Sequence, residues 1–287
     1  MNNRRDFLKA TGALALSSLL KPSALWADTL AKKPIGLQLY SVRDAMREDP
    51  QGTLQMVSSI GYRSLETANY ADGKVYGMDP VFFKKYISDL GMRLRSAHLG
   101  GPRTYDPAKK EEALDWWKKA ADDHKLMGAK YLIKPSMPIP TTLKELDIWC
   151  NYYNEVGEIA QKTGLKFGFH NHAREFEKIE GKVMMDYMIE NTDPKLVCFE
   201  LDVYWSQKGG QDPVAYINKY GKRFPVLHIK DEEEIGASGT MDFKSIFEAA
   251  YKNGMKEYFV EVERYNFEPV ISVQKSYEFL NKASYVR

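Results

Sequence analysis

The chain has 287 residues, of which 44% are hydrophobic and 28% are charged, and its formal net charge is +2. These values are typical of a globular protein and exclude a disordered, collagen-like or coiled-coil chain. Every apolar run is shorter than the roughly 20 residues that a membrane-spanning helix needs, so the chain is not a polytopic membrane protein. Two cysteines, Cys150 and Cys198, are too few for a disulfide scaffold or a cysteine-rich zinc module.

The first 27 residues have the layout of a secretory signal. A polar, basic start (residues 1–9) precedes an apolar run (residues 10–20) and a small residue for cleavage, Ala27. Residues 3–9 also resemble the bacterial twin-arginine signal, with Asn3 in place of the usual Ser or Thr. We therefore predict a signal peptide of the twin-arginine type over residues 1–27, a periplasmic location and no membrane attachment after its removal. An ordinary N-terminal amphipathic helix is the alternative.

Charge argues against a nucleic-acid partner. Residues 1–27 contain four basic side chains and one acidic side chain, so the rest of the chain has 37 basic and 38 acidic residues. Nucleic-acid affinity comes largely from clustered basic side chains, and the charges of this chain are scattered and balanced. We therefore expect a small-molecule partner, while a homo-oligomer is left open.

Residues 33–287 repeat one pattern, in which a short apolar segment is followed by a polar turn and a helical stretch. The apolar segments are expected to be strands, and they cover residues 35–39, 62–65, 93–97, 130–133, 166–169, 196–201, 225–229 and 257–262. Helical spacing is clear over residues 107–127 and 141–163. Eight strands alternating with helices predict an α/β fold, a single (β/α)8 TIM barrel. A doubly wound open sheet is the alternative, but the first strand lacks the glycine-rich phosphate loop usual after it.

Polar side chains follow or end nearly every predicted strand. In a (β/α)8 barrel the active site forms at the carboxyl ends of the strands and in the loops after them. These positions are occupied here by Gln38, Tyr40, Glu66, His98, Lys134, His170, His172, Asp202, His228, Lys230, Glu261 and Glu263. Interior positions of a barrel are usually branched and apolar, so this set indicates a functional site.

Four of these residues have the chemistry of metal ligands. His170, Asp202, His228 and Glu261 end successive strands at intervals of 32, 26 and 33 residues, or about one strand–helix unit each. A single His or Asp at the end of a strand is more often a capping residue than a metal ligand. Four such residues at the ends of successive strands favour binding of one shared metal ion. Two imidazoles and two carboxylates suit one divalent metal ion, manganese, cobalt or zinc, with magnesium as an alternative.

Four motifs contain these residues. They are Phe-His-Asn-His at residues 169–172, Glu-Leu-Asp-Val at 200–203, Leu-His-Ile-Lys-Asp at 227–231 and Val-Glu-Val-Glu at 260–263. Together with residues 35–41 and 61–66, they resemble the motifs of the xylose isomerase-like TIM-barrel proteins, also called the sugar phosphate isomerase/epimerase family. The resemblance covers residue 33 to the C-terminus. It implies a divalent metal at the ends of the last four strands and proton abstraction next to a sugar carbonyl, through an enediolate.

The resemblance predicts a sugar isomerase or epimerase, with two departures. Epimerases of this family usually carry Glu at the position of His170, which leaves Glu261 alone of an opposed acid/base pair. A metal-dependent lyase or dehydratase, acting by β-elimination on a keto-sugar or keto-glycoside, is therefore an alternative. Many relatives also have His where this chain has Trp205.

Roles for the remaining residues follow from their chemistry. We expect the catalytic groups to be Glu261, Glu263 and His172 as candidate bases and Lys230 as the holder of a developing negative oxygen. The residues expected to bind the sugar or keto-sugar are Gln38, Tyr40, Glu66, His98 and Trp205. Lys134 is expected to be a solvated loop lysine, and Cys150 and Cys198 to be core residues. A metal-free, non-catalytic sugar-binding barrel of the periplasm is a further alternative.

Overall fold

The computed structural model describes residues 33–102 and 104–287, and Lys33–Arg287 form one compact unit. The predicted signal peptide, residues 1–27, lies outside the described residues. Within them, no helix combines the length and the apolar character required to cross a bilayer.

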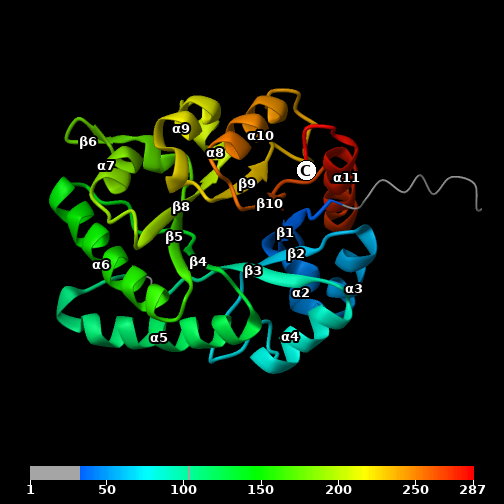
Figure 1. Cartoon of the computed structure of the whole chain (residues 1–287), viewed down its shortest axis with the longest axis horizontal. Coiled ribbons are helices and arrows are strands. Elements are labelled where there is room, and N and C mark those ends of the chain that lie inside the picture. The colour runs from blue at the N-terminus through cyan, green and yellow to red at the C-terminus, as the bar shows by residue number, and fades with distance from the viewer. Residues whose placement is uncertain (1–32, 103) are drawn as a thin grey trace, which may run out of the picture. The chain divides into compact units, whose positions relative to one another are not determined.

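Parallel strands close into a barrel at the centre of the molecule (Figure 1). In order around the barrel they are β1 (Gly36–Gln38), β10 (Glu257–Glu261), β9 (Val226–Lys230), β8 (Val197–Asp202), β5 (Lys166–His170), β4 (Tyr131–Lys134), β3 (Arg93–His98) and β2 (Ser64–Thr67). Strand β1 closes the ring, since Leu37 is in register with Val260 of β10 and with Leu65 of β2. The predicted (β/α)8 barrel is confirmed, and every predicted strand agrees with the observed one to within about two residues.

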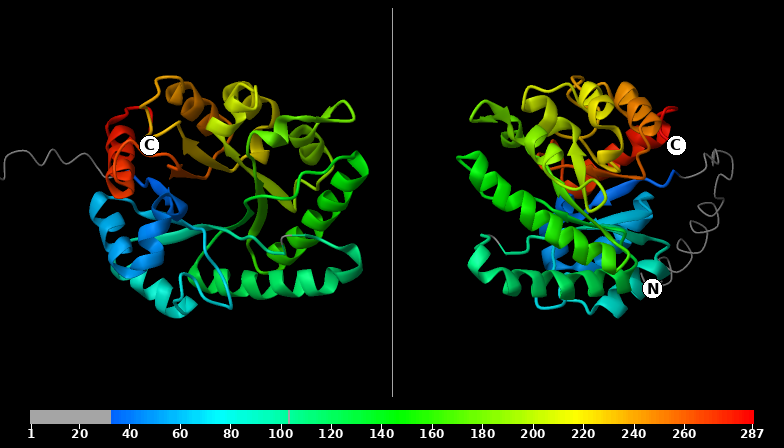
Figure 2. Two further views of the ribbon diagram at one scale, coloured as in Figure 1. Left: turned by 180° about the vertical axis from the view of Figure 1, so that it is seen from behind. Right: turned by 60° about the vertical axis from the view of Figure 1, so that its left-hand side comes forward.

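Helices surround the strands on the outside (Figure 2). They are α2 (Arg43–Glu48), α3 (Pro50–Ile60), α4 (Pro80–Asp89), α5 (Lys110–Met127), α6 (Leu143–Lys162), α7 (Met184–Glu190), α8 (Val203–Lys208), α9 (Pro213–Tyr220), α10 (Phe243–Lys252) and α11 (Pro269–Lys282). Short 3-10 turns are η1 (Leu39–Val42), η2 (Pro107–Lys109), η3 (Arg174–Phe176) and η4 (Gly221–Arg223). The helix predicted over residues 107–127 therefore begins three residues later, because its first residues form η2.

Local sequence signals explain where several helices begin and end. The Thr142 side chain caps α6 by accepting a hydrogen bond from the backbone N–H of Glu145, whose carboxylate in turn accepts one from the Thr141 N–H at 2.7 Å. Such reciprocal bonds satisfy N–H groups that the first turn of a helix leaves free. Helix α5 ends at Gly128, which adopts a left-handed conformation (φ 96°) that glycine reaches without strain.

The interior of the barrel changes character along the strands. A small buried apolar cluster fills the part of the barrel further from the carboxyl ends of the strands. It consists of Tyr131, Ile133, Cys198, Val226 and Phe259. Because side chains alternate along a strand, the residues two positions further toward the carboxyl ends point into the same interior. Those residues include Glu200, His228 and Glu261, all buried. The apolar layer therefore supports a layer of ionisable groups.

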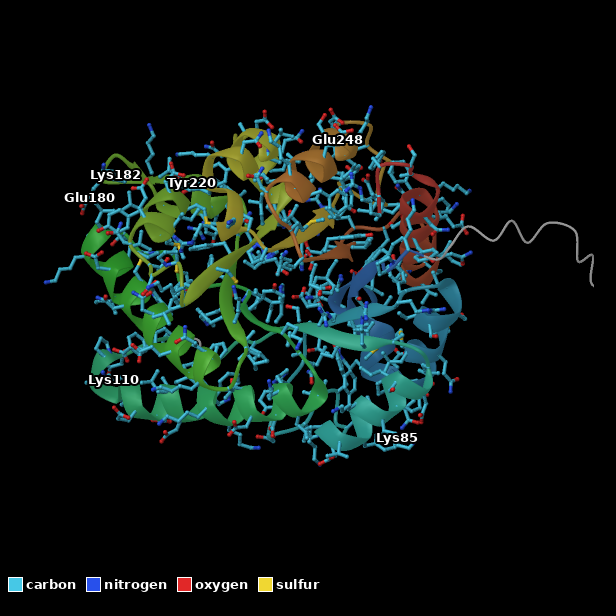
Figure 3. All side chains as sticks on the ribbon, in the orientation of Figure 1. Lys85, Lys110, Glu180, Lys182, Tyr220 and Glu248 are labelled. Atoms are coloured by element: carbon cyan, nitrogen blue, oxygen red, sulfur yellow. The ribbon has the colours of Figure 1, made fainter. Side chains whose placement is uncertain are left out.

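Outside the barrel, charged side chains are exposed and apolar side chains are buried, as is usual in globular proteins. Charged side chains such as Lys85, Lys110 and Glu248 lie at the periphery of the molecule (Figure 3). Cys150 and Cys198 are buried, as predicted, and both are free. A hairpin of β6 (Lys178–Ile179) and β7 (Lys182–Val183) interrupts the connection from β5 to α7 and is a feature that we did not predict.

Candidate active site

The four predicted metal ligands converge in the structure. His170, Asp202, His228 and Glu261 are all buried, and each offers one donor atom within 4.8 Å of the others. They form what we call the outer set. The Asp202 Oδ2 atom has no hydrogen-bond partner among the described residues. Since a buried polar atom without a partner costs free energy, and the donors are those that a borderline divalent ion prefers, the outer set fits a metal ion.

Strand ends and helix starts hold these ligands in place. Asp202 ends β8 and caps α8, because its Oδ1 accepts a hydrogen bond of 2.8 Å from the Trp205 N–H. The Asn171 side chain bonds the backbone of Asp202 in both directions, accepting from its N–H at 3.1 Å and donating to its carbonyl at 3.3 Å. With one oxygen and the backbone committed, the second carboxylate oxygen of Asp202 remains for a ligand.

Glu200 is a functional candidate that the sequence reasoning missed. Its Oε2 atom lies 2.6 Å from His98 Nε2, 3.2 Å from His170 Nδ1 and 3.2 Å from His228 Nε2. Glu200 thereby completes a second, deeper group of metal-capable residues with these three histidines. Its position two residues before Asp202 on β8 is the signal that could have found it, because both side chains must face the barrel interior.

Glu66 lies at the same depth. Its Oε2 accepts a hydrogen bond of 2.8 Å from Gln38 Nε2 and lies 2.5 Å from His228 Nε2. The other ring nitrogen of His228, Nδ1, lies 3.3 Å from Glu261. The structure therefore places Gln38 and Glu66, which we expected to bind substrate, fully buried and beneath the outer set.

Burial and neighbouring charges compete in setting the pKa values of these carboxyl groups. Burial, and then the charge of Glu66, raises the pKa of Glu200 to about 7. Burial, against the pull of Lys230, also raises the pKa of Asp202 to about 7. Burial opposes ionisation of Glu261 as well, but Lys230 and His228 outweigh it and hold the pKa of Glu261 well below its usual range. A bound cation would favour the ionised form of each carboxyl.

A cavity of about 350 Å³ opens onto the outer set, and we call it the reaction cavity. Of the residues that we expected to act on or bind the substrate, five line it: Tyr40, His98, His172, Glu261 and Glu263. Lys230 lies beside it, with Nζ 2.7 Å from Glu263 and 3.4 Å from Glu261. The Trp205 ring lies next to His172, at 5.9 Å between ring centroids. The reaction cavity thus brings candidate bases together with the metal-capable residues.

Lys134 is buried, so our expectation of a solvated lysine was wrong. Its Nζ donates hydrogen bonds to the carbonyls of Gly100, at 2.5 Å, and Pro102, at 3.4 Å. Burial lowers the pKa of Lys134 to about 8. These bonds tie the loop after β3 to the end of β4, next to the wall that Gly100, Pro135 and Ser136 contribute to the reaction cavity.

Comparisons with known proteins identify the family of the chain. The family model described as xylose isomerase-like TIM barrel matches residues 54–283. An inosose dehydratase of Geobacillus thermodenitrificans is 27% identical over 255 residues, or 75% of this chain and 83% of that protein. Another, of Geobacillus kaustophilus, is 26% identical over 194 residues, which span 62% of this chain and 60% of that relative's length.

Solved structures give the same assignment. A sugar phosphate isomerase/epimerase of Parabacteroides distasonis is 36% identical, with a TM-score of 0.84 over 89% of this chain and 100% of that chain. A second structure from the same organism, described in the same words, is 34% identical, with a TM-score of 0.85 over 90% of this chain and 96% of that chain. The chain belongs to the xylose isomerase-like TIM-barrel family.

Proposed function

We propose that this protein is a metal-dependent carbon–oxygen lyase that acts on a keto-sugar. The proposal rests on the acid–base groups of the reaction cavity. Its two carboxylates, Glu261 and Glu263, lie two residues apart in the chain and both contact Lys230, so they do not form an opposed pair. The other ionisable groups of its wall are the imidazoles of His98, His170 and His172. An elimination needs one base and one acid. Epimerisation by two carboxylates needs those carboxylates to lie on opposite sides of the substrate carbon. The dehydratase relatives support the same reaction class, because a dehydratase expels an oxygen substituent.

The outer set would hold the metal ion. His170, Asp202, His228 and Glu261 would bind manganese, cobalt or zinc, which as a Lewis acid would supply positive charge at the substrate carbonyl. A solved structure that contains zinc, described as an IOLI protein, shares the fold with a TM-score of 0.69 at 14% identity. Lys230 would add a second positive charge beside the same cavity, since its Nζ contacts both Glu261 and Glu263.

His172 is the residue that we assign as the base. Burial lowers the pKa of His172, so its imidazole is neutral at pH 7 and accepts a proton. Its backbone N–H donates a hydrogen bond of 2.7 Å to the buried carboxylate of Glu175, which fixes the position of the residue. Glu261 is a weaker candidate, because a carboxylate whose pKa is held low has little affinity for a proton.

His98 is the residue that we assign as the acid. Burial lowers the pKa of His98, but Glu66 and Glu200 more than offset that effect and raise it overall. Two groups in one cavity with pKa values shifted in opposite directions are suited to opposite roles in proton transfer. In the proposed reaction His172 takes the proton next to the carbonyl, a C=C bond forms, the C–O bond to the neighbouring substituent breaks, and His98 protonates the departing oxygen.

An isomerase or epimerase is the second candidate. The two Parabacteroides distasonis structures, described as sugar phosphate isomerase/epimerase, favour it. It shares the first step with the elimination, because both reactions remove a proton next to a carbonyl. The two reactions differ in their second step, since an isomerase returns the proton to carbon and retains every oxygen substituent.

One experiment separates these candidates. The purified protein is loaded with manganese, cobalt or zinc, its metal content is measured by elemental analysis, and keto-sugars are followed by NMR in deuterated water. We expect metal-dependent loss of an oxygen substituent, abolished in Asp202→Asn, which keeps the cap of α8 but loses the carboxylate charge. Deuterium incorporation without elimination would favour the isomerase. Absence of both metal binding and turnover would leave the sugar-binding barrel.

We also propose that the protein works in the periplasm. The twin-arginine-type pattern of residues 1–27 supports this location. Replacing Arg4 and Arg5 with lysine should retain the full chain in the cytoplasm of a host that has this export route. Equal periplasmic amounts of the variant and the parent would contradict it.

A further inference from the structure

A second cavity adjoins the reaction cavity. It encloses about 600 Å³ and is lined by residues of η1, α2, the start of α3 and the loop after β2. Tyr40 and Ala68 line both cavities, so the two spaces meet at these residues. The described residues that line the second cavity include no His, Asp or Glu. Of these two cavities, the reaction cavity is therefore the one lined by imidazoles and carboxylates, while the larger space offers room and binding groups.

The sizes of the two cavities indicate a substrate with two parts. The reaction cavity, at about 350 Å³, is near the lower end of the range of small-molecule sites, roughly 300–1,000 Å³. A single sugar ring held at the outer set would leave the second cavity unused. A substrate with two rings would occupy both, with the link between its rings passing Tyr40 and Ala68.

The wall of the second cavity suits a ring that carries hydroxyl groups. Tyr40 is 42% exposed and presents its aromatic ring where the cavities meet. The Arg43 guanidinium lies 4.7 Å from the centre of that ring and 5.5 Å from the centre of the Tyr265 ring. Arg43 Nη1 donates hydrogen bonds to the Tyr265 hydroxyl and the Tyr40 carbonyl. Among the described residues no carboxylate pairs with Arg43, so its Nε and Nη2 hydrogens face no competing anion.

We propose that the second cavity holds the group that the reaction expels, and that this group is a second ring, a sugar or a phenol, joined to the keto-sugar through oxygen. The inference rests on the proposed lyase activity and names its substrate class, the keto-glycosides. The proton leaves the carbon next to the carbonyl, the C=C bond forms, and the C–O bond to the second ring breaks. The ring departs as an alcohol or phenol after its oxygen takes a proton, so no oxidant or reductant is needed.

Asn69 provides the test, because it lines the second cavity and is absent from the wall of the reaction cavity. Asn69→Trp should fill part of the second cavity. Lys74→Trp is the matched control, since Lys74 is exposed in the same loop and lines neither cavity. The substrates are one keto-sugar that carries methoxy, phenoxy or glucosyloxy at the position of the leaving group, assayed with the metal-loaded protein.

The measured quantity is the ratio of kcat/KM for each ring-bearing substrate to kcat/KM for the methoxy substrate. We expect Asn69→Trp to lower this ratio roughly tenfold or more, as a change of about 1.4 kcal/mol in transition-state binding would, and Lys74→Trp to leave it unchanged. A larger effect on the phenoxy or on the glucosyloxy compound identifies the ring. An unchanged ratio in Asn69→Trp would overturn the proposal.

Binding of unreactive compounds separates this proposal from the lyase proposal. Phenyl glucoside and a glucosyl glucoside lack the keto group and cannot react, so calorimetry reports their affinity whether or not the protein is a lyase. We expect both to bind the parent more tightly than methyl glucoside does, with the difference lost in Asn69→Trp. Equal affinity of all three compounds for the parent would overturn the second-ring subsite even if elimination is observed.

Discussion

The Nε2 atom of His228 lies 2.5 Å from Oε2 of Glu66, deep inside the barrel. Nδ1 of the same ring lies 3.3 Å from Glu261, another member of the outer set. The His228 imidazole therefore connects the deeper carboxylate Glu66 with the outer-set carboxylate Glu261. A carboxylate that accepts a hydrogen bond from one ring nitrogen leaves the other nitrogen with a lone pair for a metal ion and makes it a stronger ligand. Glu66 thus acts on the site through His228.

Glu66→Gln should weaken metal binding. The neutral amide keeps the size of the side chain but is a poorer acceptor for the His228 N–H, and loss of such partners typically costs 10–100-fold in metal affinity. We expect a dissociation constant at least roughly tenfold higher, measured by competition with a chelator. Glu112→Gln, an exposed change on α5, should have no effect. Equal affinity in Glu66→Gln and the parent would show that Glu66 does not support the ligand.

Lys230→Met should alter the pH dependence of activity. Lys230 is the main group that holds the pKa of Glu261 low against burial. Removing its charge lets the pKa of Glu261 rise, so the carboxylate takes up its proton at a higher pH. The acidic limb of the kcat/KM profile should therefore move to higher pH, with a lower maximum. A profile of unchanged shape, merely scaled down, would assign Lys230 to substrate binding alone.

His172→Gln should separate catalysis from metal binding. His172 lines the reaction cavity but is not one of the outer-set ligands. If it is the base, glutamine should lower kcat by roughly 10²–10⁴, the usual contribution of general base catalysis, while the metal content stays at that of the parent. Because burial lowers the pKa of His172, the parent should retain activity below pH 6.5. Metal loss in the variant would instead make His172 a ligand.

The sequence predicted the features that depend on the repeat of strand and helix along the chain. Strand–helix alternation gave the barrel, and spacing by about one unit brought His170, Asp202, His228 and Glu261 to one place. What it could not show is depth within the barrel. Gln38 and Glu66 are strand-end residues in register with each other, yet both lie below the outer set, because strand tilt and stagger decide the height of each residue. Glu200 lies before the strand end that we considered, although its spacing of two residues from Asp202 already places it on the same interior face.

Two further differences arise from local packing. Lys134 follows an apolar strand and precedes Pro135, a pattern that resembles a surface loop, but the carbonyls of the loop after β3 fold over its ammonium group. The β6–β7 hairpin turns at Glu180 and Gly181, both with positive φ (49° and 83°). Its Gly181 is the only element of a hairpin signature in that segment, and each strand of two residues is too short to show alternation.

The remaining histidine, His124, should contribute to the stability of the barrel and not to its chemistry. It is fully buried in α5, where its Nδ1 lies 2.7 Å from the Ala120 carbonyl and its ring packs on Tyr70. Burial lowers its pKa to about 4, against about 6.5 for an unfolded chain. The unfolded state therefore binds the proton first as the pH falls, so the stability contributed by neutral His124 is fully present above pH 6.5.

That contribution should be lost between pH 6.5 and about 4 and should amount to about 3 kcal/mol in the free energy of unfolding. His124→Phe keeps an aromatic ring of similar size and removes the titration. We expect urea unfolding at several pH values to show a smaller loss of stability on acidification in His124→Phe than in the parent. Lys125→Gln, an exposed change next to it, should follow the parent. Parallel curves for His124→Phe and the parent would mean that His124 is protonated equally in the folded and unfolded states, which its burial among apolar neighbours makes costly.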